Sequence, residues 1–121
     1  MWKISFEPDR HLLTLRLRGH VGPIQMREIA AAQAQALEAT GGTSFRVLID
    51  LRGLHPMEAE AVALFADMKR VAAAVPGYEG CAVLADSPTV AMQQHRARLE
   101  ADTGELITMD EGEVRRFLTP G

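Results

Sequence analysis

The stretch Phe45-Arg46-Val47-Leu48-Ile49-Asp50-Leu51 decides the fold that this chain is expected to adopt. It is rich in branched apolar side chains, and Arg46 is the only charged residue before Asp50. A run with so little alternation of polar and apolar residues is typical of a strand that is covered on both faces. We therefore predict a strand in the middle of a sheet.

The residues before this strand predict a β-hairpin. Residues 2–6 and 13–17 alternate between apolar and polar side chains, and the turn-forming residues 7–10 separate them. Such alternation is typical of strands with one buried face. A connection of four residues cannot return a strand in parallel, so the first strand should be antiparallel to the second.

Helices are predicted from their start and stop signals. Gly22-Pro23 and Ser87-Pro88 place a proline at the first helical position, and Pro56 is expected to begin another helix. Asp110, with Glu113 three residues later, resembles a capping box before a short last helix. The expected helices span 23–40, 56–75, 89–101 and the residues that follow Asp110.

Strands expected at 81–85 and 105–109 complete the order ββαβαβαβα. Strands that alternate with helices indicate an α/β fold with a mostly parallel sheet, here with an antiparallel first strand. A chain of 121 residues is in the usual range for one core. We therefore predict that residues 1–121 form a single domain.

The second long helix should present two faces. One is an apolar stripe for the core, made of Met57, Ala61, Leu64, Phe65, Met68, Val71, Ala72 and Val75. The other is made of small side chains, Ala59, Val62, Ala63, Ala66 and Ala73. This small-residue face would let another helix approach closely, and the first strand offers a pairing edge. We therefore expect that a homodimer can form.

The charges and the single cysteine bear on partners and compartment. The net charge is −3, and the 13 basic residues are scattered among 16 acidic ones, so we expect no nucleic-acid partner. No apolar run could span a bilayer and no export signal follows Met1, so we expect a cytoplasmic protein. Cys81 lies in an apolar run and should behave as a small buried hydrophobe in a reducing compartment.

Candidate catalytic residues are expected at the carboxyl ends of the parallel strands, where ligands bind in open α/β sheets. Asp50, His55 and Asp86 could form an acid/base set in a shallow pocket. Alternatively, Asp50 accepts backbone N–H bonds, Asp86 closes a turn and His55 faces solvent. Ser87 has no nucleophile elbow around it, so it is best interpreted as a helix cap. His95, between Met92 and Leu99, should be half-buried.

No cofactor or metal site is expected. The four histidines are not spaced as metal ligands, and one cysteine cannot build a zinc site without them. The glycines match neither a phosphate-binding loop nor a dinucleotide-binding loop.

The order of elements, together with the strand end Ile49-Asp50-Leu51-Arg52-Gly53, resembles the SpoIIAA-like branch of the STAS domains over nearly the whole chain. The resemblance implies a non-enzymatic module, such as an anti-sigma-factor antagonist, that binds a protein partner near the start of the helix after the third strand. That region is Arg52 to Glu60 here. Its expected partner-binding residues are Arg52, Gly53, His55, Met57 and Glu58.

The sequence departs from this family at one point. In the antagonists a Ser or Thr at this helix start is phosphorylated, whereas Tyr78 carries the only hydroxyl side chain between Leu51 and Asp86. We therefore expect no phosphorylation switch at this position, with Ser87 and Thr89 as the nearest other sites. Our leading hypothesis is an interaction module, and the alternative is a small enzyme or ligand-binding protein that uses Asp50, His55 and Asp86.

Overall fold

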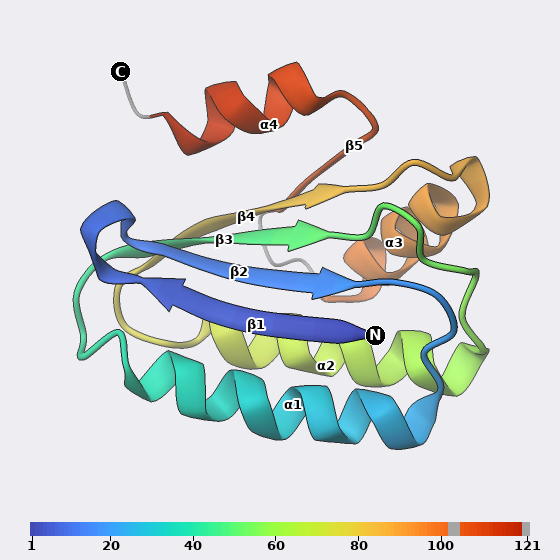
Figure 1. Ribbon diagram of the computed structural model, residues 1–121, viewed down its shortest axis with the longest axis horizontal. Coiled ribbons are helices and arrows are strands. Elements are labelled where there is room, and N and C mark those ends of the chain that lie inside the picture. Colours follow the sequence, from blue (N-terminus) through green and yellow to red (C-terminus); the bar gives the residue numbers. More distant parts are fainter. Residues whose placement is uncertain (102–104, 120–121) are drawn as a thin grey trace.

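The computed structural model describes residues 1–101 and 105–119, with side chains up to residue 98 and from 105 onward. Its sheet has five strands in the order β1-β2-β3-β4-β5 (Figure 1). β1 and β2 are antiparallel and the remaining pairs are parallel. The strands are β1 (Trp2–Glu7), β2 (Leu12–Leu17), β3 (Phe45–Asp50), β4 (Tyr78–Leu84) and β5 (Glu105–Thr108). The expected fold class, hairpin and central position of residues 45–51 are therefore confirmed.

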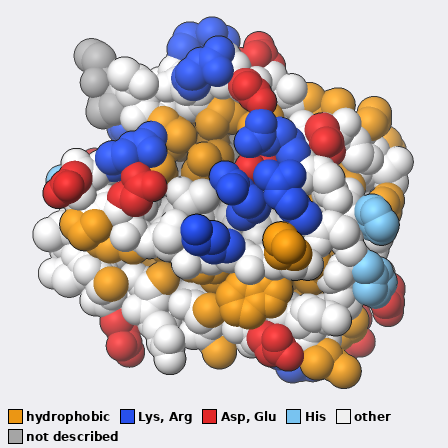
Figure 2. All heavy atoms as spheres, viewed as in Figure 1, with side chains coloured by type: hydrophobic (Ala, Val, Ile, Leu, Met, Phe, Trp, Pro, Cys, Tyr) orange, Lys and Arg blue, Asp and Glu red, His pale blue; other side chains and the backbone are white. Residues whose placement is uncertain are grey.

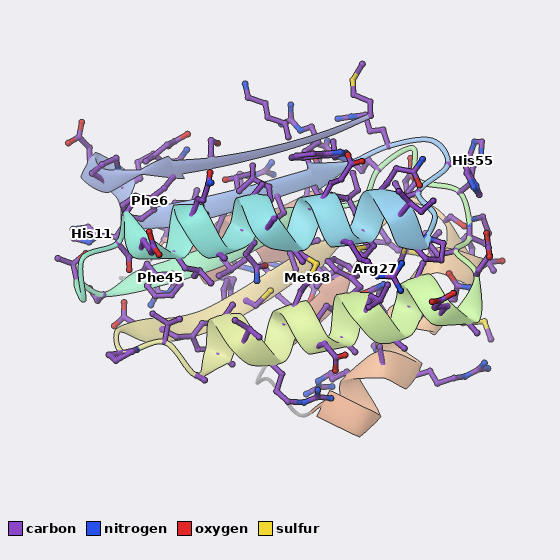
Figure 3. All side chains as sticks on the ribbon, turned by 90° about the horizontal axis from the view of Figure 1, so that it is seen from below. Phe6, His11, Arg27, Phe45, His55 and Met68 are labelled. Atoms are coloured by element: carbon purple, nitrogen blue, oxygen red, sulfur yellow. The ribbon has the colours of Figure 1, made fainter. Side chains whose placement is uncertain are left out.

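Helices cover the two faces of the sheet unequally. α1 (Pro23–Glu38) and α2 (Ala59–Ala73) lie side by side on one face, with Met68 between them (Figure 3). α3 (Pro88–Ala101) packs against α2 and β5 on the same side. α4 (Glu111–Leu118) lies on the opposite face over β4 and β5, and it also packs against Leu48 of β3 (Figure 1). The opposite face of β1 and β2 is therefore not covered by a helix of the described chain.

The main core lies between the sheet and the α1–α2 layer. Alternate residues of the strands point into it, and the fully buried ones include Leu13, Leu15, Leu17, Phe45, Val47, Ile49, Cys81 and Val83. Cys81 is buried, as expected, and burial raises the pKa of its thiol. A thiol of this kind is not a reactive thiolate at neutral pH.

Several expectations about helices were wrong. α2 begins at Ala59 rather than at Pro56. The N-cap Glu58 is extended, and Met57 bonds to Gln93 instead of entering the helix: its N–H donates to Gln93 Oε1 at 3.0 Å and its C=O accepts from Gln93 Nε2 at 2.9 Å. Asp110 caps α4, but Glu113 does not complete a capping box, because Glu113 Oε1 accepts a hydrogen bond from Thr108 Oγ1 at 2.6 Å.

Three side chains also lie elsewhere than expected. Val71, placed on the core stripe, is 56% exposed, and His95, expected to be half-buried, is exposed. The side chain of Leu99, expected beside His95, lies outside the described residues. Ala66 was assigned to an outer small-residue face and instead belongs to the interior. Because α2 packs against both α1 and α3, more of its surface is buried than the one stripe that faces the sheet.

An ion pair is buried among α2, α3 and β5. Lys69 Nζ lies 3.0 Å from Glu105 Oε2, and it also donates a hydrogen bond to Gln94 Oε1. The side chains of Lys69 and Glu105 are 3% and 0% exposed. Charged side chains are seldom buried without a partner. Lys69 and Glu105 therefore stabilise the packing of α2, α3 and β5 together. Removing either one would leave the other charge buried without a partner.

Within the described residues, no helix is both long enough and apolar enough to cross a membrane.

Candidate functional site

The loop that joins β3 to α2, residues 51–58, is packed against the body of the protein. We call it the β3–α2 loop. Leu54 and Met57 point inward and are buried in the main core. The Leu54 N–H also donates to the Leu51 carbonyl at 3.1 Å, which closes a turn. Burial of these two apolar side chains fixes the path of the loop.

Hydrogen bonds tie the β3–α2 loop to both neighbouring loops. The N–H of Gly19 donates to Gly53 O, and the N–H of His55 donates to Gly19 O, each at 2.9 Å. On the other side, the Gly53 N–H donates to both carboxylate oxygens of Asp86 at 3.1 Å. Gly53 has a φ of +82°, a conformation that favours glycine. These hydrogen bonds and this glycine hold the β3–α2 loop against both neighbouring loops.

The expected partner-binding residues are not equally placed. Gly53, His55 and Glu58 are exposed, and Arg52 is partly exposed. Figure 3 shows His55 at the end of the molecule where α1 and α2 begin. Met57 is different, because its side chain is 5% exposed and belongs to the core. Met57 therefore supports the loop rather than offering a contact surface.

Asp50 lies at the end of β3 among three arginines. Its side chain is 2% exposed, and Arg52 Nη2 donates to Asp50 Oδ2 at 2.9 Å. The same oxygen lies 3.4 Å from Arg16 Nε and 3.7 Å from Arg18 Nη2. Burial alone would raise the pKa of Asp50, but hydrogen bonds from Arg52 and the charges of Arg52 and Arg18 hold that pKa below its usual value. We call Arg16, Arg18 and Arg52 the arginine triad.

Replacing Asp50 with Asn should lower the free energy of unfolding by about 1–3 kcal/mol, because the arginine triad loses its buried counter-charge. The loss should depend on pH. Since the pKa of Asp50 is lower when folded than its usual 3.8, its contribution is complete above that value and is lost as the pH falls through the folded value. Urea unfolding of both proteins near neutral pH and in acid should show the difference shrinking in acid. A difference that stays constant with pH would contradict this account.

The alternative acid/base set does not assemble as one site. The Asp50 carboxylate is paired with the arginine triad. It also accepts a hydrogen bond from the backbone N–H of Arg52 at 3.1 Å, as the alternative interpretation of Asp50 as an acceptor of backbone N–H bonds predicted. The Asp86 carboxylate accepts the N–H of Gly53, which belongs to the neighbouring β3–α2 loop. It does not close its own turn, contrary to the expectation. No hydrogen bond among the described residues joins His55 to either carboxylate. Among all the residues that the structure describes, no cluster of His, Cys, Asp and Glu side chains could hold a metal ion.

Sequence reasoning missed the convergence of the arginine triad on Asp50. The register pairs Arg16 with Asp50 across β2 and β3, so the two side chains share one face of the sheet. The alternation of residues 13–17 already placed Arg16 on the polar face of its strand. What the sequence alone did not provide was the register between β2 and β3.

No family model and no curated protein matches this chain. Solved structures do. An uncharacterized protein of the DUF3478 family from Shewanella loihica PV-4, described as having a SpoIIAA-like fold, shares 13% sequence identity with a TM-score of 0.69. The match covers 98% of this chain and 93% of that one.

Two structures of SpoIIAA match in the same way. The Bacillus cell fate determinant SpoIIAA in its phosphorylated form has a TM-score of 0.64 and 19% identity, over 97% of this chain and 99% of that one. The anti-sigma factor antagonist SpoIIAA in its unphosphorylated form has a TM-score of 0.68 and 20% identity, over 97% and 96%. This chain has a SpoIIAA-like fold. The resemblance inferred from the element order is thereby confirmed at the level of the SpoIIAA-like fold.

Proposed function

We propose that this SpoIIAA-like chain is a non-enzymatic regulatory module that works in the cytoplasm and binds a protein partner through the β3–α2 loop and the start of α2, Arg52 to Glu60. The observation that carries the proposal is the fixed shape of the loop. Two buried anchors and hydrogen bonds from both neighbouring loops hold it, while His55 and Glu58 remain exposed. A surface ordered in advance loses little conformational entropy on binding.

The site offers more to a protein than to a small reactant. The carboxylates of Asp50 and Asp86 are both engaged in holding the fold, so neither is free to act with His55 in proton transfer. The exposed part of the loop combines a guanidinium, an imidazole and the Glu58 carboxylate, groups that suit the polar rim of a protein interface. The fold itself supports this choice, since one of the similar structures is described as an anti-sigma factor antagonist.

Affinity capture with Glu58→Lys tests the proposal. Tagged wild-type protein and variant would be recovered from the native cell, and the bound proteins quantified by mass spectrometry. We expect the partner recovered with wild type to fall about tenfold or more with the variant, because a charge is reversed inside the interface. Glu38→Lys makes the same charge change at the far end of α1, where Glu38 is exposed, and should retain the partner. Equal recovery with all three proteins would refute the proposal.

The module should work without phosphorylation at the start of α2. Glu58 occupies the N-cap position there, and it supplies a negative charge close to the helix dipole. The nearest hydroxyl at a helix start, Ser87 Oγ, accepts a hydrogen bond from the Val90 N–H at 3.3 Å as a cap of α3. Mass spectrometry of the protein from its own cells should find the loop and α2 unmodified. Stoichiometric phosphate on Ser87 or Thr89 that abolishes partner binding would contradict this prediction.

Self-association is part of the same proposal. β1 is an edge strand of the sheet, and a hollow of about 300 Å³ between α2 and α3 is lined by Ala59, Val62, Ala63, Gln93, Arg96 and Ala97. Small side chains at such a hollow allow a helix of a second copy to approach closely. The hollow includes Ala59 at the start of α2, so a homodimer formed there would border the proposed partner site.

A further inference from the structure

The sheet face opposite α1 and α2 gathers, on and around β1, β2 and β3, basic side chains that are far apart in the sequence. The register places residues directly across from one another in rows, so Lys3, Arg16 and Asp50 form one row and Glu7, Leu12 and Arg46 form another. Arg10 and Arg16 line one hollow on this face, and Arg10 and Arg46 line a second. Arg18 and Arg52 belong to the same face because both form ion pairs with Asp50. We call this surface the basic sheet face; its basic members are Lys3, Arg10, Arg16, Arg18, Arg46 and Arg52.

The charge of the basic sheet face is opposite to that of the chain. Six basic side chains lie here with four acidic ones among the described residues, Glu7, Asp50, Glu79 and Glu111, although the whole chain carries −3. Figure 2 shows Lys and Arg side chains clustered on this side of the molecule. An excess of one charge on one face attracts a partner of the other charge.

The arginines of the triad retain hydrogen-bonding capacity. Asp50 is a single carboxylate shared among three guanidiniums, and Arg16 and Arg18 lie 3.4 and 3.7 Å from it, farther than the 2.9 Å of the hydrogen bond from Arg52. Their side chains are 49% and 41% exposed. Each guanidinium has five N–H donors in a planar arrangement that fits a carboxylate. The buried Asp50 thus positions the arginines and leaves donors facing outward.

Two leucines lie among the polar side chains of this face. A hollow of about 250 Å³ over β1, β2 and β3 is lined by Leu12 and Leu48 together with Lys3, Ser5, Glu7, Arg10, Thr14 and Arg16. A second hollow of about 220 Å³ adjoins it and is lined by Leu12, Leu118 and Arg46. Ligands that carry both charge and an apolar group suit such a lining.

We propose that the basic sheet face is a second binding surface, and that its occupant is an acidic segment of a protein partner with an apolar side chain seated over Leu12 and Leu48. This second surface shares one premise with the proposed function, namely that the chain binds proteins. A peptide fits better than a nucleic acid, because the chain is acidic overall and the hollow over Leu12 and Leu48 is lined by no aromatic ring on which a base could stack.

Fluorescence anisotropy with a defined probe tests this surface directly. The probe is a short fluorescein-labelled peptide of Asp and Glu with a central Leu, and the comparison peptide has Asn and Gln in their place. We expect the acidic peptide alone to bind, with an affinity that falls as ionic strength rises. Lys3→Glu and Arg16→Gln should each weaken binding about tenfold. Arg98→Glu, an exposed charge reversal on α3, should leave binding unchanged.

Three results would overturn the proposal. They are failure of the acidic peptide to bind the wild-type protein, equal binding by Lys3→Glu, and tighter binding of a DNA duplex than of the peptide. Lys3 is exposed and lies outside the arginine triad, so its variant should fold even if Arg16→Gln does not. Glu58→Lys should still bind the peptide, because Glu58 lies outside this face. Failure of the β3–α2 loop to bind a partner is therefore distinguishable from failure here.

Discussion

Replacing Lys69 with Ala should lower the free energy of unfolding by about 3–5 kcal/mol, because it leaves a buried carboxylate without its counter-charge. Glu105 is 0% exposed and lies 3.0 Å from the Lys69 ammonium. Gln94 also loses the hydrogen bond that Lys69 donates to its side-chain oxygen. The loss should be measured by urea unfolding followed by circular dichroism.

The neighbouring residue offers a matched control. Arg70 pairs with Asp67 on the same helix, but both side chains are more than half exposed, so Arg70→Ala should change stability by less than about 1 kcal/mol. The double variant Lys69→Met with Glu105→Leu should recover much of the stability lost by Lys69→Ala, because no buried charge remains. If Lys69→Ala were as stable as Arg70→Ala, the ion pair would be solvated and the description of this cluster would be wrong.

Phe65→Ala should cost about 3–5 kcal/mol, since it removes a buried aromatic ring and leaves a cavity. Phe65 is 1% exposed, and its ring lies 5.1 Å from the Lys69 ammonium, so the variant also removes a cation–π contact. Denaturant unfolding measures the effect as a lower midpoint. Val71→Ala is the control on the same helix, because Val71 is 56% exposed and should shift stability by about 0.5 kcal/mol or less.

An unchanged midpoint for Phe65→Ala would mean that Phe65 is exposed and that the core face of α2 is wrong. Phe65 and Lys69 contact each other, so the costs of the two substitutions should not add.

Local patterns predicted the fold well. The alternation of residues 2–6 and 13–17 and the apolar run at 45–51 identified the hairpin and the central strand, because these periods follow from burial of one or both faces. The start of α2 was misplaced because its position depends on Gln93, which binds both backbone groups of Met57 from 36 residues along the chain. Local propensity favoured Pro56 and carried no information on that contact.

The candidate site was predicted only in part. His55 and Glu58 are exposed as expected, because a loop at the carboxyl end of a parallel strand reaches the surface. The arginine triad and the buried Lys69 were missed, since each is defined by a partner on another element. Scattered basic residues in the sequence gather on the basic sheet face only once the register of three strands is known.

Photo-crosslinking in the native cell tests the central claim most directly, that a protein partner binds the β3–α2 loop. A benzophenone amino acid would replace His55, and in a separate protein it would replace Glu38 at the far end of α1; both positions are exposed. The account predicts that illumination joins a distinct protein to the chain labelled at position 55 and not to the chain labelled at position 38. Crosslinking to one protein from position 38 alone, or from neither position, would contradict the account.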